Sequence, residues 1–233
     1  MLNLFISAIL ALPGFRADVS NWGKGTVVLY TVYGGLSDTG EMIQSVSRVE
    51  DVYAFMRRIK QAPQNSSITD SIYMELDEKG NPLWFYEKTV MTFGKNPPIT
   101  GETMVQYRDT LISILRRTSS GEMDTATVRA KEVAYPSAFV PFLLESADLK
   151  QGDSLKFRVL YPMNKRLGDA TVISQGVGTL STSLGKKKAV RYLLKLDRRS
   201  FNIWYDVRPP HRMLKYMDLG TEMRYHIKKV LKP

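Results

Sequence analysis

From residue 25 onward, hydrophobic and polar residues alternate with a period of two, which is typical of strands that bury one face. The opening segment 25–35, GTVVLYTVYGG, is rich in β-branched and aromatic residues and ends in two glycines. Further alternating segments, such as SLKFRVLYP and GTLSTSLGKKKAVRYLLKLD, follow with turn residues about every ten positions. Regular short strands of this kind predict an antiparallel β-sandwich or barrel rather than β-α-β units.

The clearest local pattern is in residues 71–93, SIYMELDEKGNPLWFYEKTVMTF, where two alternating segments flank a short polar stretch. Gly80 can adopt the positive φ of a tight turn, and Pro82 stands where the second segment begins. The stretch therefore predicts an antiparallel β-hairpin.

The C-terminal stretch 200–227 predicts a meander of strands. Phe201, Ile203 and Tyr205 fall on one face of the first strand. The two prolines of DVRPPHR cannot donate ladder hydrogen bonds, so this strand is expected to end there. Asp206 precedes them and is expected to form the turn rather than to act as a general acid.

Two segments are less regular. Residues 42–61 have apolar residues at helical spacing, but their valine, tyrosine and phenylalanine content suits strands, and we predict strand. Residues 135–153, YPSAFVPFLLESADLKQGD, contain a compact apolar cluster followed by glycine. This pattern predicts a short helical segment near 137–146 that plugs one end of the sheet, although Pro141 limits its regularity.

The first residues have the length and hydrophobicity of a secretory signal. An apolar run extends from Leu2 to Leu12 and is followed by proline, glycine and the small residue Ala17. Residues 1–17 are therefore predicted to be a signal peptide, and 18–233 a single domain, in a protein that is periplasmic or otherwise exported. The alternative is a buried first strand or helix, because no lysine or arginine precedes the apolar run.

The chain of 233 residues is 43% hydrophobic, which is enough to bury the core of one domain. Its formal net charge of +10 would suit an anionic partner, such as nucleic acid, a phospholipid head group or a surface polymer. The basic residues are scattered in groups of two or three, however, which is typical of solvated strand ends. The sequence contains no cysteine, which excludes disulfides, thiolate metal sites and attachment of lipid to an N-terminal cysteine.

Candidate chemistry is sparse. The sequence contains two histidines, His211 and His226, and neither has a metal ligand at short spacing. There is no nucleophile elbow, phosphate-binding loop, zinc-protease motif or calcium loop. We therefore predict no catalytic residue, no metal ligand and no cofactor, while a pair of carboxylates could still be brought together by the fold.

Several segments, taken in order, resemble a group of bacterial exported proteins of unknown function. They are the first strand 25–35, the hairpin 71–93, the block 135–162 and the closing stretch 201–220. The resemblance implies a single curved antiparallel sheet that forms a half-barrel or near-closed barrel, similar to the lipoprotein-localisation factors LolA and LolB. It implies no catalytic residue.

A strongly curved sheet has a concave apolar face, which can hold an acyl chain or another elongated apolar ligand if helices and loops leave it unfilled. Large apolar side chains are the candidates for lining it, although such residues are most often plain core residues. These candidate ligand-binding residues are Trp84, Tyr86, Phe139, Phe142, Trp204 and Met217.

These features predict a non-enzymatic exported protein, a binding or scaffold module for a lipid-like or other apolar ligand. An envelope protein or an anionic polymer is a further expected partner. One alternative is an enzyme on the same half-barrel that acts mainly by positioning its substrate, similar to the violacein-pathway protein VioE. The least favoured alternative is a nucleic-acid binder driven by the positive charge.

The signal-peptide prediction can be tested by N-terminal sequencing of the protein secreted by its native host. We expect the mature chain to lack the apolar run, because signal peptidase removes such segments on export. A mature protein that retains Met1 would contradict the prediction.

Overall fold

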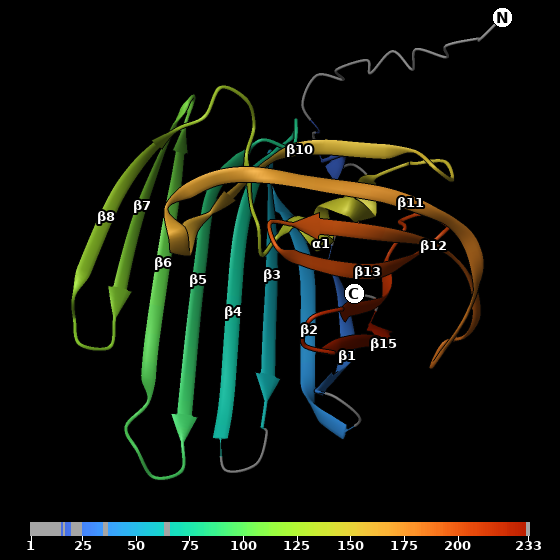
Figure 1. The fold of residues 1–233 in the computed structure, drawn as a ribbon, viewed down its shortest axis with the longest axis horizontal. Helices are drawn as coiled ribbons and strands as arrows, with labels where there is room; N and C mark the ends of the chain where they lie inside the picture. The colour runs from blue at the N-terminus through green and yellow to red at the C-terminus, as the bar shows by residue number, and fades with distance from the viewer. Residues whose placement is uncertain (1–14, 16, 20–24, 35–36, 63–65, 232–233) are drawn as a thin grey trace, which may run out of the picture.

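The computed structural model describes residues 15, 17–19, 25–34, 37–62 and 66–231. They form one open sheet of fifteen strands with a short helical insertion (Figure 1). The predicted mostly β fold with one curved antiparallel sheet is confirmed. In chain order, the strands are β1 (Thr26–Gly34), β2 (Ser37–Val49), β3 (Val52–Gln61), β4 (Ser66–Asp77), β5 (Pro82–Phe93), β6 (Ile99–Arg108), β7 (Leu111–Thr118), β8 (Met123–Arg129), β9 (Tyr135–Pro136), β10 (Ser154–Tyr161), β11 (Arg166–Thr182), β12 (Gly185–Leu196), β13 (Arg199–Asp206), β14 (Met213–Asp218) and β15 (Arg224–Leu231).

The sheet consists of two antiparallel meanders that meet at the first and last strands. Strands β1–β8 pair in sequence outward to one edge, and β10–β15 pair in sequence back toward the middle. There β15 pairs with β1, so the chain's terminal strands are neighbours inside the sheet. The crossover between the meanders carries the short strand β9, which pairs parallel to β10 and forms the other edge. The sheet is therefore not closed.

The predicted hairpin in residues 71–93 is confirmed as β4 and β5. Gly80 has φ +76°, and the Asp77 carboxylate accepts the backbone N–H groups of Lys79 and Asn81 at 2.9 and 2.7 Å. The aspartate thus satisfies the donors that a tight turn leaves free. The prediction of strand for residues 42–61 is also confirmed, since β2 and β3 pair around a turn in which Glu50 has φ +53°.

The C-terminal meander is confirmed as β13, β14 and β15. Phe201, Ile203 and Tyr205 are buried on one face of β13, as their period predicts. Asp206 ends the strand and accepts the backbone N–H of Arg208 at 3.0 Å, so it forms the turn as expected.

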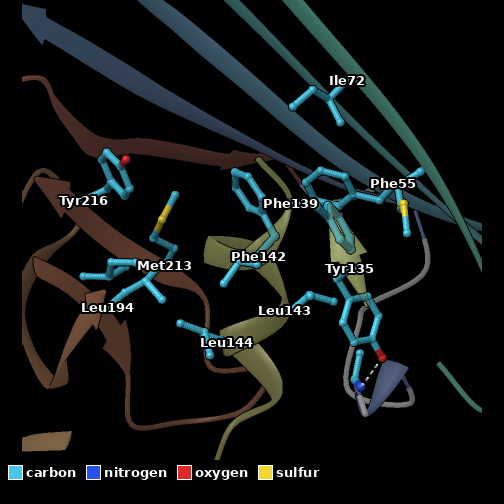
Figure 2. Close-up of a cluster of buried hydrophobic side chains, with 14 of the residues drawn as sticks. Phe55, Ile72, Tyr135, Phe139, Phe142, Leu143, Leu144, Leu194, Met213 and Tyr216 are labelled. Atoms are coloured by element: carbon cyan, nitrogen blue, oxygen red, sulfur yellow. Dashed lines mark hydrogen bonds between the residues drawn. The ribbon is translucent and has the colours of Figure 1, made fainter. Parts of the chain in front are cut away.

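The crossover lies on the concave side of the sheet and supplies much of its core. It contains α1 (Val140–Leu143) and the 3-10 turn η2 (Leu144–Ser146), which confirms the helical segment predicted near 137–146. In Figure 1, β10–β13 run across the direction of β3–β8, and α1 lies between these two parts of the curled sheet. Figure 2 shows Phe139 and Phe142 among residues of the surrounding strands, and both rings lie within 4.8 Å of the Phe55 ring, centroid to centroid. The segment thus packs against part of the concave face.

Tyr135, in β9, joins three distant parts of the chain through one buried hydroxyl. This hydroxyl donates to the carbonyl of Gly80 at 2.8 Å and accepts the backbone N–H of Ala17 at 3.1 Å. Figure 2 shows Tyr135 with one dashed line from its oxygen to a nitrogen. Most of the predicted signal segment lies outside the described residues, but Ala17 is buried and Phe15 packs against Phe157 with ring centroids 5.0 Å apart. These two residues therefore belong to the packed core in this structure.

We predict that Tyr135→Phe destabilises the fold by about 1–3 kcal/mol, because it leaves the buried carbonyl of Gly80 without a partner and, in the uncleaved chain, the N–H of Ala17 as well. The matched control is Tyr73→Phe, which removes a hydroxyl bonded to the Glu75 carboxylate on a part-buried side chain. The control should cost less than about 0.5 kcal/mol. Urea unfolding measures both free energies of unfolding, and equal losses in the two variants would contradict the role assigned to Tyr135.

Candidate functional site

A cavity of about 570 Å³ lies on the concave side of the sheet, beside the crossover. Its volume is in the range of small-molecule sites, and its walls are mainly apolar. Residues of β3, β4 and β5 form one side, residues of β13, β14 and β15 the other, and the β10–β11 turn lies at its margin. Its apolar lining includes Ile59, Ile68, Pro141, Phe142, Met163, Leu196, Phe201, Met213, Tyr216, Met223 and Tyr225.

A charged cluster is set into this apolar wall. The Arg57 guanidinium forms an ion pair with Asp70 at 2.6 Å, and the other oxygen of that carboxylate accepts the Thr89 hydroxyl at 3.1 Å. Strand register explains why these side chains meet. Asp70 in β4 is directly opposite Thr89 in β5. Ile72 in β4 is opposite both Arg57 in β3 and Glu87 in β5. Residues that are paired across neighbouring strands project from the same face.

Arg57 also holds the crossover in place. Its Nη1 donates to the carbonyl of Ala138 at 3.3 Å, and its guanidinium lies 5.6 Å from the centre of the Phe142 ring. Arg57 is buried, so the ion pair with Asp70 offsets the cost of removing its charge from water. The Arg57 side chain therefore contacts both parts of the cavity lining: Asp70 in the sheet, and the crossover segment that contains Ala138 and Phe142.

Glu87 is the third charged side chain of this cluster, and it differs from Arg57 and Asp70 in its hydrogen bonding. Its carboxyl lines the cavity and has no hydrogen bond or salt bridge to any residue in the described part of the chain. Burial, together with the nearby negative charge of Asp70, raises the pKa of Glu87 to about 7, although Arg57 acts in the opposite direction. The cavity thus presents a carboxyl group that changes charge near neutral pH.

Aromatic side chains form the wall across from the charged cluster. Tyr216 and Tyr225 stack with centroids 4.7 Å apart, and Phe201 lies 5.4 Å from Tyr216. Burial raises the pKa of Tyr225 to about 12, with Arg57 opposing this shift. Its phenol therefore stays protonated at neutral pH.

The β10–β11 turn closes one margin of the cavity by contacting β6, β7 and β8. It contains the 3-10 turn η3 (Pro162–Asn164). The carbonyl of Met163 accepts a hydrogen bond from Arg116 at 3.2 Å, and Lys165 forms an ion pair with Asp124. These contacts hold the tip of one meander against the strands of the other.

A second buried carboxyl, Glu145 in η2, lies outside the cavity lining. It accepts the backbone N–H of Met213 at 3.1 Å and the Gln44 side-chain amide at 3.4 Å. Burial raises the pKa of Glu145 to about 7, while these two hydrogen bonds and Arg212 act in the opposite direction. Glu145 therefore connects the crossover to both β2 and β14.

The structure brings one of the six predicted ligand-binding residues to the cavity, Phe142. Phe139 is fully buried in the core beside it. Trp84 and Tyr86 alternate along β5 with the inward-facing Phe85 and Glu87, so they project from the opposite face, where their rings stack 5.8 Å apart.

Trp204 and Met217 likewise lie on the face opposite the cavity. They alternate with Ile203, Tyr205 and Tyr216, which are buried on the concave side. Lys215 covers the Trp204 ring at 5.0 Å. The period of two separates the two faces correctly, but large aromatic residues occur on both, and size alone does not indicate which face is concave.

The charged cluster was not predicted from the sequence. A signal was present, however, because Arg57 stands at an inward position between Phe55 and Ile59, and Glu87 follows Phe85 on the same face. A charged residue at one of the alternate positions that otherwise carry buried apolar side chains interrupts the apolar and polar alternation of a strand. Such interruptions indicate either a buried ion pair or a functional site.

Within the described residues, no group of histidine, cysteine, aspartate and glutamate side chains is arranged to hold a metal ion. None of the helices in this part of the chain has both the length and the apolar character needed to span a membrane.

The two carboxyls with raised pKa values predict a fall in stability as the pH rises. Both bind protons more tightly in the folded chain, with a pKa of about 7, than at their ordinary value of 4.5. The stability they contribute is therefore fully present below about pH 4.5 and lost as the pH passes about 7, on the order of 3 kcal/mol for each carboxyl.

Urea unfolding across this pH range should show a shallower fall for Glu145→Gln and for Glu87→Gln than for the wild type. Glu78→Gln, in the exposed β4–β5 turn, is the control and should keep the full slope. Parallel pH profiles for all four proteins would contradict the account.

The fold has relatives among solved structures. A β-barrel-like protein of the domain of unknown function DUF1849 from Brucella abortus superimposes with a TM-score of 0.61 at 12% identity, covering 90% of this chain and 98% of that chain. A Bacteroides fragilis protein described as a candidate exported protein with a YmcC-like fold has a TM-score of 0.34 at 12% identity, over 95% and 100% of the two chains. A candidate lipoprotein from Parabacteroides distasonis has a TM-score of 0.35 at 9% identity, over 94% and 99%.

The first of these likenesses shows the fold alone, because identity this low says nothing about chemistry. The other two TM-scores are too low to support an argument. No protein-family model and no curated protein matches the sequence. The chain thus has a β-barrel-like fold that it shares with a protein of unknown function. The more specific resemblance to LolA and LolB stays a prediction.

Proposed function

We propose that this protein is an exported, non-enzymatic envelope protein that binds an amphipathic, lipid-like small molecule in its concave cavity. The observation that carries the proposal is the Glu87 carboxyl, which lines a mainly apolar cavity of about 570 Å³ and has no hydrogen bond or salt bridge to any of the described residues. Glu87 is half-buried and its carboxyl faces the cavity, so a ligand bound there could donate a hydrogen bond to it in place of water. Export rests on the apolar N-terminal run of the sequence.

The cavity's chemistry defines the ligand class. Arg198, Arg199 and Asp197 also line the cavity, but around Glu87 itself Arg57 and Asp70 neutralise each other, so the local charge is negative when Glu87 is ionised. The complementary head group is therefore a hydrogen-bond donor, most strongly an ammonium group. The apolar body of the ligand would lie against the aromatic wall and Phe142, where burial of apolar surface stabilises the complex.

A second candidate function is an enzyme that acts on a molecule bound in the same cavity. It is favoured by the convergence of Arg57, Glu87 and Tyr225 there, because a carboxyl with a pKa of about 7 suits general acid–base chemistry. The two functions differ in the fate of the ligand. A bound ligand recovered with unchanged mass favours the binding protein, and one converted during incubation favours the enzyme.

The proposal predicts a head-group preference that depends on Glu87. With one tail length held constant, dodecylamine should bind the wild-type protein more tightly than dodecanol, and dodecanoate should bind most weakly, at a pH above the Glu87 pKa. Glu87→Gln should weaken dodecylamine binding by about tenfold or more and remove the preference for the amine, because the charge-assisted hydrogen bond is lost. Isothermal titration calorimetry measures these affinities.

The matched control is Trp84→Ala, which truncates a large aromatic residue of the same strand on the opposite face. It should leave all three affinities within about twofold of the wild type, since the residue is outside the cavity lining. An amine preference that survives in Glu87→Gln, or the absence of saturable binding by any of the three amphiphiles, would refute the proposed site.

A further inference from the structure

A second hollow, of about 250 Å³, lies apart from the concave cavity and shares no lining residue with it. It is formed where the turn between β11 and β12, the loop 207–212 and strands β14 and β15 come together. We propose that this hollow is a binding site for a phosphate-type oxyanion, held by Lys187 and Arg212. The inference is independent of the function proposed for the concave cavity.

The charge in the hollow is unbalanced. Three cationic side chains line it, Lys187, Arg208 and Arg212, against one carboxylate, Asp206. Arg208 already engages that carboxylate with its backbone N–H, its Nε and its Nη2, at 3.0, 3.3 and 3.2 Å. Lys187 is near enough to Asp206 to help lower the pKa of that carboxyl, but neither Lys187 nor Arg212 forms a salt bridge with any residue of the described chain, so the hollow carries an excess of positive charge.

Arg212 is the stronger of the two signals because it is half-buried. A partly buried charge without a partner is costly, and proteins usually pair such groups. The acidic group it influences is Glu145, whose carboxyl is engaged by Met213 and Gln44 and whose pKa is raised to about 7. Glu145 is thus a weak counter-ion at neutral pH, and an oxyanion in the hollow would complete the pairing.

The hollow is a built feature rather than a gap between loops. The Ser183 hydroxyl in the β11–β12 turn lies 2.7 and 2.9 Å from the carbonyls of Ile227 and Lys228, which fixes this turn against β15. The side chains between the cations are apolar, and the hollow stays open to solvent at Leu184 and Pro209. These apolar side chains are Leu184, Leu214, Ile227 and Val230, with Pro209 and Pro210.

This chemistry selects the ligand class. Arginine presents parallel N–H donors that match the oxygens of a phosphate, and a lysine adds a second positive charge. The apolar walls suit a phosphate ester better than a free ion, because the carbon next to the ester oxygen would meet apolar side chains. The phosphate group could come from a soluble phosphate ester or from a lipid head group.

The test uses the full chain at constant ionic strength, titrated with inorganic phosphate and with glycerol 3-phosphate and followed by amide NMR shifts. We expect saturable binding with shifts in the loop 207–212 and in the β11–β12 turn. Arg212→Gln and Lys187→Gln should each weaken it by about tenfold, because each removes a charge-assisted contact. Lys195→Gln removes the same charge from an exposed position in β12 and should change the affinity less than about twofold.

A co-sedimentation assay with vesicles distinguishes the two sources. Binding to vesicles that contain phosphatidic acid but not to pure phosphatidylcholine vesicles, lost in Arg212→Gln, would assign the site to a lipid head group. Saturable binding of glycerol 3-phosphate without vesicle binding would assign it to a soluble ester. No saturable binding of either soluble probe and no Arg212-dependent vesicle binding, or equal weakening by Lys195→Gln, would overturn the proposal.

Discussion

The antiparallel pairing of β1 with β15 is the interaction on which the rest of the structure depends. These strands lie near opposite ends of the chain, yet their register runs from Val27 opposite Leu231 to Tyr33 opposite Arg224. Each meander could form from local hairpins alone, and only this pairing joins the two into one sheet. The contact closes a very long loop, which costs conformational entropy that local pairings do not. Its formation also sets where the concave face lies.

The crossover then decides how that face is covered. A curved sheet that is apolar on its concave side needs a second layer, and the segment from β9 to η2 supplies one with Phe139, Phe142 and their neighbours (Figure 2). This segment is short, so it covers only part of the face, and the remaining space is the cavity that contains Glu87. Arg57 stands at the boundary, paired with Asp70 in the sheet and bonded to the crossover backbone. The buried ion pair thus serves both the fold and the cavity, because Arg57 holds the crossover segment in place and lines the cavity together with Asp70.

Much of the fold could be predicted from the sequence, because local chemistry dictates it. Alternation of apolar residues identified the strands, Gly80 identified the β4–β5 turn, and the cluster around Pro141 identified the helical segment. The site could not be predicted in the same way. Trp84 and Trp204 have the size and hydrophobicity of cavity residues, but they project from the opposite face, and only the curvature of the assembled sheet makes one face concave. The convergence of Arg57, Asp70 and Glu87 depends on strand register, which a single sequence does not display.

The partly filled concave face leads us to propose that the protein holds a ligand there. Native mass spectrometry of the protein purified from the envelope fraction of its own host tests this most directly, with denaturing analysis of anything that dissociates. We expect one bound molecule per chain, with an apolar body and a hydrogen-bond-donating head group, and we expect its occupancy to fall in the Glu87→Gln variant. A ligand-free mass for protein recovered gently from that fraction would contradict it.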